Sequence, residues 1–197
     1  MFSAIIKPLL PLIIPCLSVC DSMTDFKLAY PSKEYEESAF EYIQEFLECN
    51  SEINGTGGLN RYDNYDEWLL KLERDLDIPN IPEGRVPANT YFLIRTSDNK
   101  IIGMINIRHK LNDFLLNEGG HIGYSIRPTE RNKGYGTLML KLGLEKCREL
   151  KLNKVLISCD KTNIGSARVI QNNNGILENE AYSKTFSAVI QRYWINL

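Results

Sequence analysis

Residues 123–140, GYSIRPTERNKGYGTLML, place an alternating apolar run, a cationic loop with two glycines and a helical run in direct succession. The missing β-carbons of Gly134 and Gly136 let backbone N–H groups approach a ligand, at a helix N-terminus whose dipole favours negative charge. Cationic and hydroxyl side chains flank these glycines: Arg127, Arg131, Lys133 and Thr137. The segment predicts a phosphate-binding loop, with a glycine turn among solvated charges as the alternative.

The loop differs from two common nucleotide-binding glycine motifs. A P-loop has its lysine after the last glycine, whereas Lys133 precedes Gly134. A dinucleotide-binding loop has a third glycine where this chain has Met139, although Asp160 does end the next predicted strand. A nucleotide binder that prefers ATP or NAD is therefore the most distant alternative.

Hydrophobic periodicity predicts one α/β domain, because period-two runs mark strands and period-3.6 runs mark helices. The predicted elements are a strand at 25–30, helices at 33–49 and 63–76, strands at 89–97, 100–111 and 120–128, a helix at 135–150, a strand at 154–160, a helix at 163–173 and two C-terminal strands. Hairpins beside strand–helix–strand units predict a mixed α+β sheet of about seven strands with flanking helices.

The first 22 residues form an apolar segment unlike the rest of the chain. Its apolar stretch, 8–20, is shorter than the roughly 20 residues of a membrane-spanning helix, and its three prolines disfavour a helix. We therefore expect an apolar extension or leader over residues 1–22 and no stable membrane span. The folded domain is expected over residues 23–197, with Met23 as a candidate start.

Charge and cysteine content exclude some partners. A net charge of −2 argues against nucleic acid, because no overall cationic field attracts a phosphate backbone. The five cysteines are scattered, with no Cys-x-x-Cys pair and no histidine at zinc spacing. They predict reduced, buried thiols, no metal site and a cytoplasmic protein.

The glycine loop resembles the coenzyme A site of the GNAT superfamily of acyl-CoA N-acyltransferases, in particular its bacterial branch of small acetyltransferases. Arg131, Gly134 and Gly136 match the signature Arg/Gln-x-x-Gly-x-Gly/Ala, and Asn163 and Ser166 match the Asn-x-x-Ser/Ala opening of the next helix. The alternative for Asn163 is a helix N-cap. The likeness covers about residues 90–197 and implies a splayed central strand pair, acetyl-CoA as cosubstrate and no metal.

The resemblance implies roles for single residues in the cofactor site. The pantetheine arm would lie along the strand before the loop, on backbone groups of Ser125 and Ile126. Arg131 and Lys133 would balance the phosphate charge, and Asn163 would bond to pantetheine or nearby backbone with Ser166 beside it. The pyrophosphate would be held by backbone amides of Asn132, Lys133, Gly134, Tyr135, Gly136 and Thr137.

The implied reaction is direct attack of an amine on the thioester, which needs a base for the amine and a proton for the thiolate. The chain has Ile170 where many relatives have a tyrosine acid, and Gly120 where some have a glutamate base. His121 and Glu118 are the candidate bases, with Glu118 expected on the strand face of Gly120. Tyr193 is the candidate acid or acceptor-site residue. The alternatives are purely structural roles and catalysis by positioning alone.

The acceptor is expected beside the second helix. Residues 60–83 are net acidic and contain Tyr62, Tyr65 and Trp68, which predicts a lining for a cationic amine, or alternatively a solvated amphipathic helix. Two functions follow: an N-acetyltransferase for a small-molecule or protein amine, and a CoA-binding sensing or interaction module without turnover. A homodimer is expected from the resemblance alone.

Overall fold

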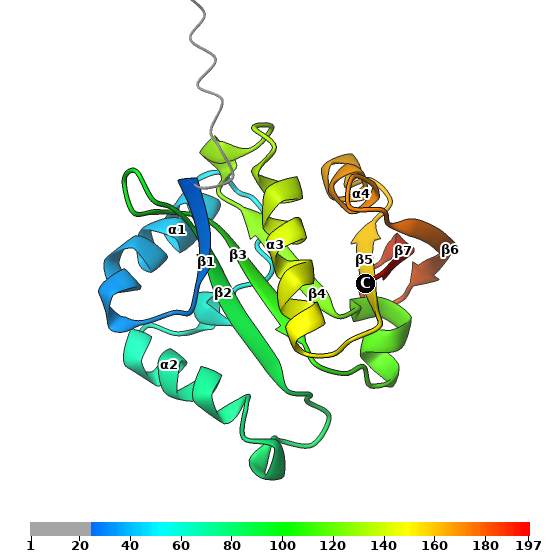
Figure 1. Ribbon diagram of the computed structural model, residues 1–197, viewed down its shortest axis with the longest axis horizontal. Coiled ribbons are helices and arrows are strands. Elements are labelled where there is room, and N and C mark those ends of the chain that lie inside the picture. Colours follow the sequence, from blue (N-terminus) through cyan, green and yellow to red (C-terminus); the bar gives the residue numbers. More distant parts are fainter. Residues whose placement is uncertain (1–24) are drawn as a thin grey trace, which may run out of the picture.

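The computed structural model describes residues 25–197 as two β-sheets whose edge strands meet, with helices around them (Figure 1). The strand orders are β1-β2-β3-β4 and β5-β7-β6, and all paired strands are antiparallel. The arrangement confirms the predicted mixed α+β fold. The extension expected at residues 1–22 lies outside the described residues. Among those described, no helix has both the length and the apolarity to cross a membrane.

The elements follow the chain in the predicted order. The strands are β1 Phe26–Ala29, β2 Ala88–Arg95, β3 Lys100–Arg108, β4 Ile122–Ile126, β5 Lys154–Asp160, β6 Ile176–Ser183 and β7 Ala188–Asn196. The helices are α1 Glu36–Glu48, α2 Tyr65–Arg74, α3 Tyr135–Glu149 and α4 Ile164–Gln171. Strand β4 is shorter than predicted, because Gly120 adopts a φ of +67° and Pro128 begins a short helical turn.

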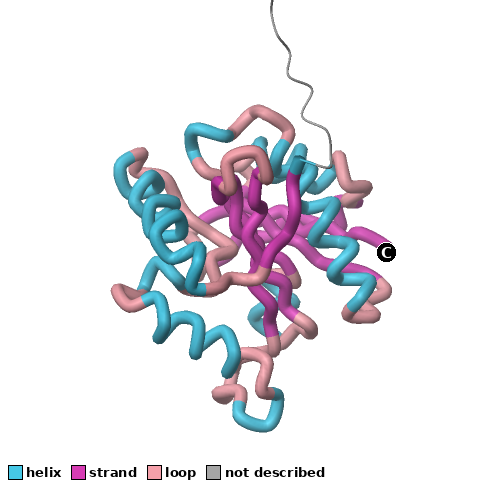
Figure 2. Tube along the Cα trace, turned by 60° about the vertical axis from the view of Figure 1, so that its left-hand side comes forward, coloured by secondary structure: helices cyan, strands magenta, loops and turns pink. Residues whose placement is uncertain are grey.

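The four-stranded sheet is covered on both faces, by α3 on one and by α1 and α2 on the other (Figure 2). Ile105 and Ile107 of β3 pack in the core under α3, whereas Met104 packs in the core under α1 and α2. Because strand side chains alternate between faces, Asn106 and Arg108 face the same side as Met104. That side holds the polar groups discussed below.

Strands β4 and β5 meet at one end and diverge toward the other. At the joined end the His121 N–H donates to the Leu156 carbonyl at 2.7 Å, and the Leu156 N–H donates to His121 Nδ1 at 2.9 Å. Farther along, Tyr124 of β4 reaches Ser166 of α4, with 2.9 Å between the hydroxyl oxygens. The two strands belong to separate sheets, which confirms the expected splayed pair.

A buried ion pair ties α1 to the end of β4. Arg127 is 4% exposed, and its Nη1 donates to Glu45 Oε2 at 2.9 Å. The Thr129 N–H and hydroxyl donate to the other carboxylate oxygen at 2.9 and 2.8 Å. Burial opposes ionisation, yet these bonds leave the pKa of Glu45 below its ordinary value. Arg127 therefore anchors the glycine loop. The sequence suggested that it adds free positive charge to the loop, and this is wrong because its charge is paired with Glu45.

Three cysteines lie in residues 25–197, and all are free thiols. Cys147 and Cys159 are buried, and burial raises the pKa of both, to about 12 and about 11. Cys49 is exposed at the C-terminal end of α1, so the prediction of a buried thiol is wrong for this residue.

Candidate functional site

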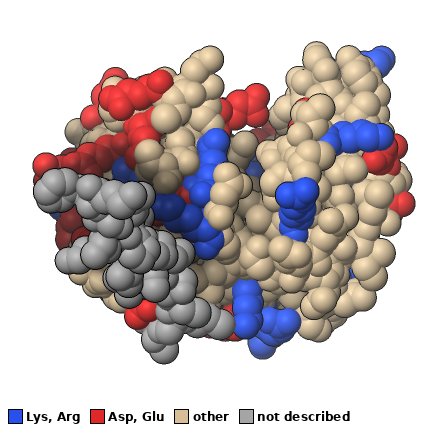
Figure 3. Space-filling view, turned by 90° about the horizontal axis from the view of Figure 1, so that it is seen from above, with Lys and Arg blue, Asp and Glu red and all other residues tan. Residues whose placement is uncertain are grey.

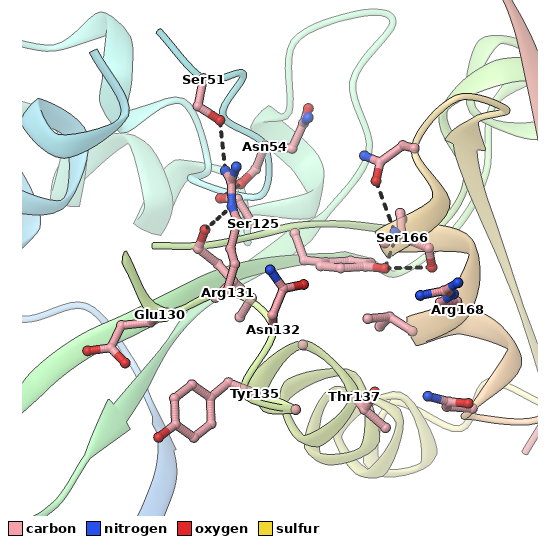
Figure 4. A pocket seen from close by; sticks show the side chains of 18 of the residues that line it. Ser51, Asn54, Ser125, Glu130, Arg131, Asn132, Tyr135, Thr137, Ser166 and Arg168 are labelled. Carbon is pink, nitrogen blue, oxygen red and sulfur yellow. Dashed lines mark hydrogen bonds between the residues drawn. The ribbon is translucent and has the colours of Figure 1, made fainter. Parts of the chain in front are cut away.

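A pocket of about 550 Å³ opens between β4, α4 and the N-terminus of α3. Side chains enter it from the loop, from α3 and from α4 (Figure 4). Lys and Arg side chains lie along the hollow seen from above in Figure 3. The pocket is lined by the residues predicted for the cofactor, apart from Lys133: Ser125, Ile126, Arg131, Asn132, Gly134, Tyr135, Gly136, Thr137, Asn163 and Ser166.

The turn before α3 leaves the first amides of the helix open to the pocket. Gly134 is the N-cap with a φ of +85°, and no side chain caps the helix. The first-turn N–H groups have no partner within the helix. A β-carbon at Gly134 would have no atom within 4 Å, so the space before these amides is open. The arrangement fits a phosphate group.

The two cations of the loop have different surroundings. Arg131 lines the pocket, where its Nη2 donates to Ser51 Oγ at 2.8 Å and its guanidinium lies over the Phe46 ring. Lys133 instead directs its ammonium to Glu130 Oε2 at 2.8 Å. The expectation that Lys133 balances the phosphate charge therefore needs correction, because its ammonium is paired with the carboxylate of Glu130, a residue of the pocket lining, and the pair adds no net positive charge.

The backbone of β4 is turned differently from the sequence prediction. The Arg127 N–H donates to a carbonyl of β3 at 2.9 Å, so strand alternation turns the backbone of Ser125 toward β3 as well. The backbone groups of Tyr124 and Ile126 then face the gap. The Tyr42 hydroxyl lies 2.9 Å from the Ser125 carbonyl and 3.0 Å from its hydroxyl. Tyr124, and not Ser125, therefore presents its backbone to the gap.

The start of α4 holds a capping asparagine and a hydroxyl pair. Asn163 Oδ1 accepts from the Ser166 N–H at 2.9 Å, which confirms the N-cap alternative. Ser166 Oγ is bonded to the Tyr124 hydroxyl across the gap. Burial raises the pKa of Tyr124, so its hydroxyl stays protonated at neutral pH.

Arg168 is a pocket residue that the sequence analysis missed. Gly165, Arg168, Val169 and Asn172 line the pocket at the spacing of one helix face. Arg168 is exposed and has no ion pair among residues 25–197. Continuing the helical spacing from Gly165 would have found it.

If acetyl-CoA binds here as the resemblance implies, replacing Arg168 with methionine is expected to weaken its binding about five- to tenfold, because an exposed cation of the pocket lining would lose its contact with a ligand phosphate. Titration calorimetry at two salt concentrations measures this, and the wild-type affinity should depend more steeply on salt. Arg148→Met, on the exposed end of α3, is the matched control. Equal losses in both variants would exclude a local phosphate contact.

The candidate base His121 lies at the joined end of β4 and β5. It is 7% exposed, and its Nδ1 accepts the Leu156 N–H. Burial lowers its pKa to about 4, so the ring is neutral at pH 7. His121 does not line the pocket, and its role as a base stays a prediction.

The other two catalytic candidates also lie outside the pocket lining. Glu118 belongs to the helical turn Leu115–Gly119, so its expected place on a strand face is wrong, and its Oε2 accepts from Ser183 Oγ at 2.7 Å. Tyr193 is 1% exposed and donates to Gln191 Oε1 at 2.8 Å. Their catalytic roles stay predictions. Within residues 25–197 no cluster of three His, Cys, Asp or Glu side chains suits a metal ion.

The aromatic acceptor lining expected beside α2 is wrong for two of its three aromatic residues, whereas Tyr62 lines a second pocket with Glu67, Glu73 and Asp77. Tyr65 and Trp68 are fully buried and pack in the core beneath α1 and α2. Asp75 is also buried and pairs with Lys71. An amphipathic helix turns its aromatic residues toward the sheet, which is the alternative that the sequence left open.

Comparisons with known proteins agree with this geometry. Residues 60–175, more than half of the chain, match the family model described as the acetyltransferase (GNAT) domain. No curated protein matches the chain significantly in sequence.

Several solved structures share the fold. The ribosomal-protein-S5-alanine acetyltransferase from Vibrio fischeri superposes with a TM-score of 0.64 at 14% identity, over 87% of this chain and 93% of that chain. The acetyl transferase from Salmonella typhimurium that modifies the N-terminal serine of ribosomal protein L7/L12 gives 0.62 at 15%, over 88% and 96%. The microcin C7 self-immunity acetyltransferase, in complex with acetyl-CoA and AMP, gives 0.60 at 18%, over 88% and 93%. At these identities the likeness concerns the fold.

Proposed function

Because the chain belongs to the acetyltransferase (GNAT) family and is an acyltransferase of that fold, we propose that it transfers an acetyl group from acetyl-CoA to an amine by direct attack. The observation that carries the proposal is the pocket itself. Open amides behind the left-handed Gly134 belong to it, and β4 and α4 lie along it where β4 diverges from β5. This shape suits a ligand with a diphosphate at one end and an extended arm.

When bound, acetyl-CoA supplies the thioester: the amine nitrogen bonds to the carbonyl carbon, the carbon–sulfur bond breaks, the nitrogen loses a proton and the CoA thiolate gains one. The amides of the first α3 turn bind the diphosphate, with Arg131 and Arg168 beside them. The backbone of Tyr124 and the N–H of Ile126 hold the extended arm, because the Ile126 carbonyl already accepts from Arg131 Nε at 3.2 Å. The Tyr124 hydroxyl, protonated and bonded to Ser166, is a donor in the pocket lining.

The acceptor belongs to the proposal as a small-molecule or protein amine. The ribosomal-protein acetyltransferases among the structural neighbours are named for protein amines, which keeps that class open here. A cytoplasmic location and a homodimer are further expectations. His121 or Glu118 as the base and Tyr193 as the acid remain part of the proposal. None of the three lines the pocket, so each would have to act on the substrate through another group.

A CoA-binding module without turnover is the second candidate. It is favoured by Ile170, which is fully buried and carries no proton to donate, and by the three catalytic candidates lying outside the pocket lining. Turnover separates the two functions.

The test is to incubate the protein with acetyl-CoA and a panel of free amino acids, their carboxamides, polyamines and N-terminally free peptides. Release of free thiol and the mass of the acetylated product are measured. Thiol release that depends on an amine supports acetyl transfer. Saturable acetyl-CoA binding with no release for any amine would leave the sensing module.

A further inference from the structure

Arg108, at the end of β3, is a cation without a counter-ion. Its Nη1 donates to the carbonyls of Gly119 and Gly120, at 3.2 and 3.0 Å. No carboxylate of residues 25–197 lies within ion-pair distance of it. Burial lowers the pKa of the guanidinium, so the charge is held here at a cost in free energy. An uncompensated cation in a partly buried position is typical of a binding site.

A second donor converges on the same point. The position that a β-carbon would take at Gly123 lies 3.6 Å from Arg108 Nη2 and 3.6 Å from the Gly55 nitrogen. No hydrogen bond from the Gly55 N–H exists among the described residues. Gly55 lies directly on β4, with a φ of +75°, and a side chain there would meet the Gly123 carbonyl. The two donors therefore flank the position above Gly123, where one additional atom would make ordinary van der Waals contacts with both.

Arg108, Gly55 and Gly123 do not line the proposed cofactor pocket, but Gly55 follows its lining residue Asn54 directly in the chain. Gly123 comes immediately before Tyr124, with which the lining of β4 begins. The opposite end of the pocket holds the open α3 amides. An extended arm from those amides along β4 places its far end near Tyr124 and Gly123. The position above Gly123 is on the sheet face of Asn106 and Arg108, which is the face covered by α1, α2 and the loop that contains Gly55.

We infer that the acceptor is an amine that also carries a carboxylate, as free amino acids do, and that Arg108 and the Gly55 N–H bind this carboxylate above Gly123. The inference rests on the proposed acetyl transfer and names its substrate class. A guanidinium favours a planar anion that accepts two parallel hydrogen bonds. An acceptor without an anionic group would bring an ammonium toward the unneutralised Arg108, which is unfavourable. Arg108 is thus a specificity-determining residue.

The experiment compares free amino acids with their carboxamides as acceptors at saturating acetyl-CoA. The two members of each pair carry the same α-amine. The amine of the carboxamide is less basic, so a larger fraction of it is unprotonated at neutral pH, which by itself favours the carboxamide. We expect kcat/KM to be at least tenfold higher for the carboxylate member. Ethanolamine and its phosphate ester form an additional pair, which distinguishes a carboxylate site from a phosphate site.

Variants assign the selectivity to the proposed atoms. Arg108→Met should raise KM for carboxylates and bring the ratio to about one or below, whereas Arg108→Lys should retain part of it. Gly123→Ala should have the same effect without changing charge, because its β-carbon would make only ordinary van der Waals contacts and would occupy the position between the two donors. Arg148→Met should leave the ratio unchanged. Unaltered acetyl-CoA affinity and melting temperature confirm that each variant is folded.

The outcomes separate the inference from the function on which it rests. Carboxamides, polyamines or peptide amides acetylated as well as carboxylates would leave acetyl transfer standing and overturn the carboxylate site. A preference for the phosphate ester would overturn it too. So would an equal loss of kcat for every amine in Arg108→Met, which would indicate a role at the thioester. No acetylation of any amine would overturn the proposed function and the inference with it.

Discussion

Replacing Gly134 with aspartate is expected to weaken acetyl-CoA binding by about 100-fold or more, because the new carboxylate would stand before the open α3 amides and repel a diphosphate. Aspartate tolerates a left-handed φ and is a good N-cap, and nothing within 4 Å obstructs its β-carbon. The variant should therefore fold. At about 100 times the dissociation constant, acetyl-CoA should stabilise the wild-type protein by about 2.7 kcal/mol. A thermal shift measures the loss of this stabilisation in the variant.

Gly134→Asn is the matched control, because asparagine has the same shape and capping ability without the charge. It should lose only a few-fold in affinity. Wild-type affinity in Gly134→Asp would mean that the phosphates bind elsewhere. An equal loss in both variants would point to the geometry of the turn and not to phosphate charge.

Folding is expected to become less favourable by about 2 kcal/mol between pH 7 and pH 5, chiefly through His121. The folded pKa of about 4 lies below the ordinary value of 6.5. The unfolded chain therefore binds the proton first as the pH falls. The stabilisation is complete above the unfolded pKa and is lost as the pH falls through 6.5 toward 4. Urea denaturation across this range measures the change.

His121→Gln should be less stable at pH 7, because the contact with the Leu156 N–H changes, but its stability should vary much less between pH 7 and pH 5. His109→Gln is the comparison, since burial lowers the pKa of this half-buried histidine as well, and it should remove a smaller part of the pH dependence than His121→Gln. An unchanged pH dependence in His121→Gln would show that His121 is not the group responsible. The same measurement bears on His121 as a base, because a ring with a pKa near 4 is a weak one.

The cofactor pocket was predictable from the sequence because its parts follow one another closely. The strand, the glycine loop and the first turn of α3 are contiguous, and Asn163 opens the helix that faces them. The sequence did not predict which charged side chains of the loop pair with one another. Lys133 seemed free beside the glycines, yet Glu130 lies three residues before it on a short helical turn and takes its ammonium.

The acceptor side was not predictable in the same way. Gly55, Arg108 and Gly123 come from a loop and two strands, and only the β3–β4 register and the approach of the loop bring them together. Periodicity finds an amphipathic helix but does not say whether its apolar face meets a core or a ligand. For that reason Tyr65 and Trp68 were assigned to a substrate surface and are core residues.

The fork between β4 and β5 has a consequence for how the folded chain holds together. The main-chain hydrogen bonding of one sheet does not continue into the other beyond the junction at His121, and the backbone of Tyr124 and Ile126 faces the gap. An acyl-CoA arm lying there would act as a missing strand. In the free protein, the amide hydrogens of the two sheets would then exchange through separate opening events. In the complex, they would exchange through one common event. The concentration of a metabolite, and not the polypeptide alone, would decide how cooperatively this domain unfolds.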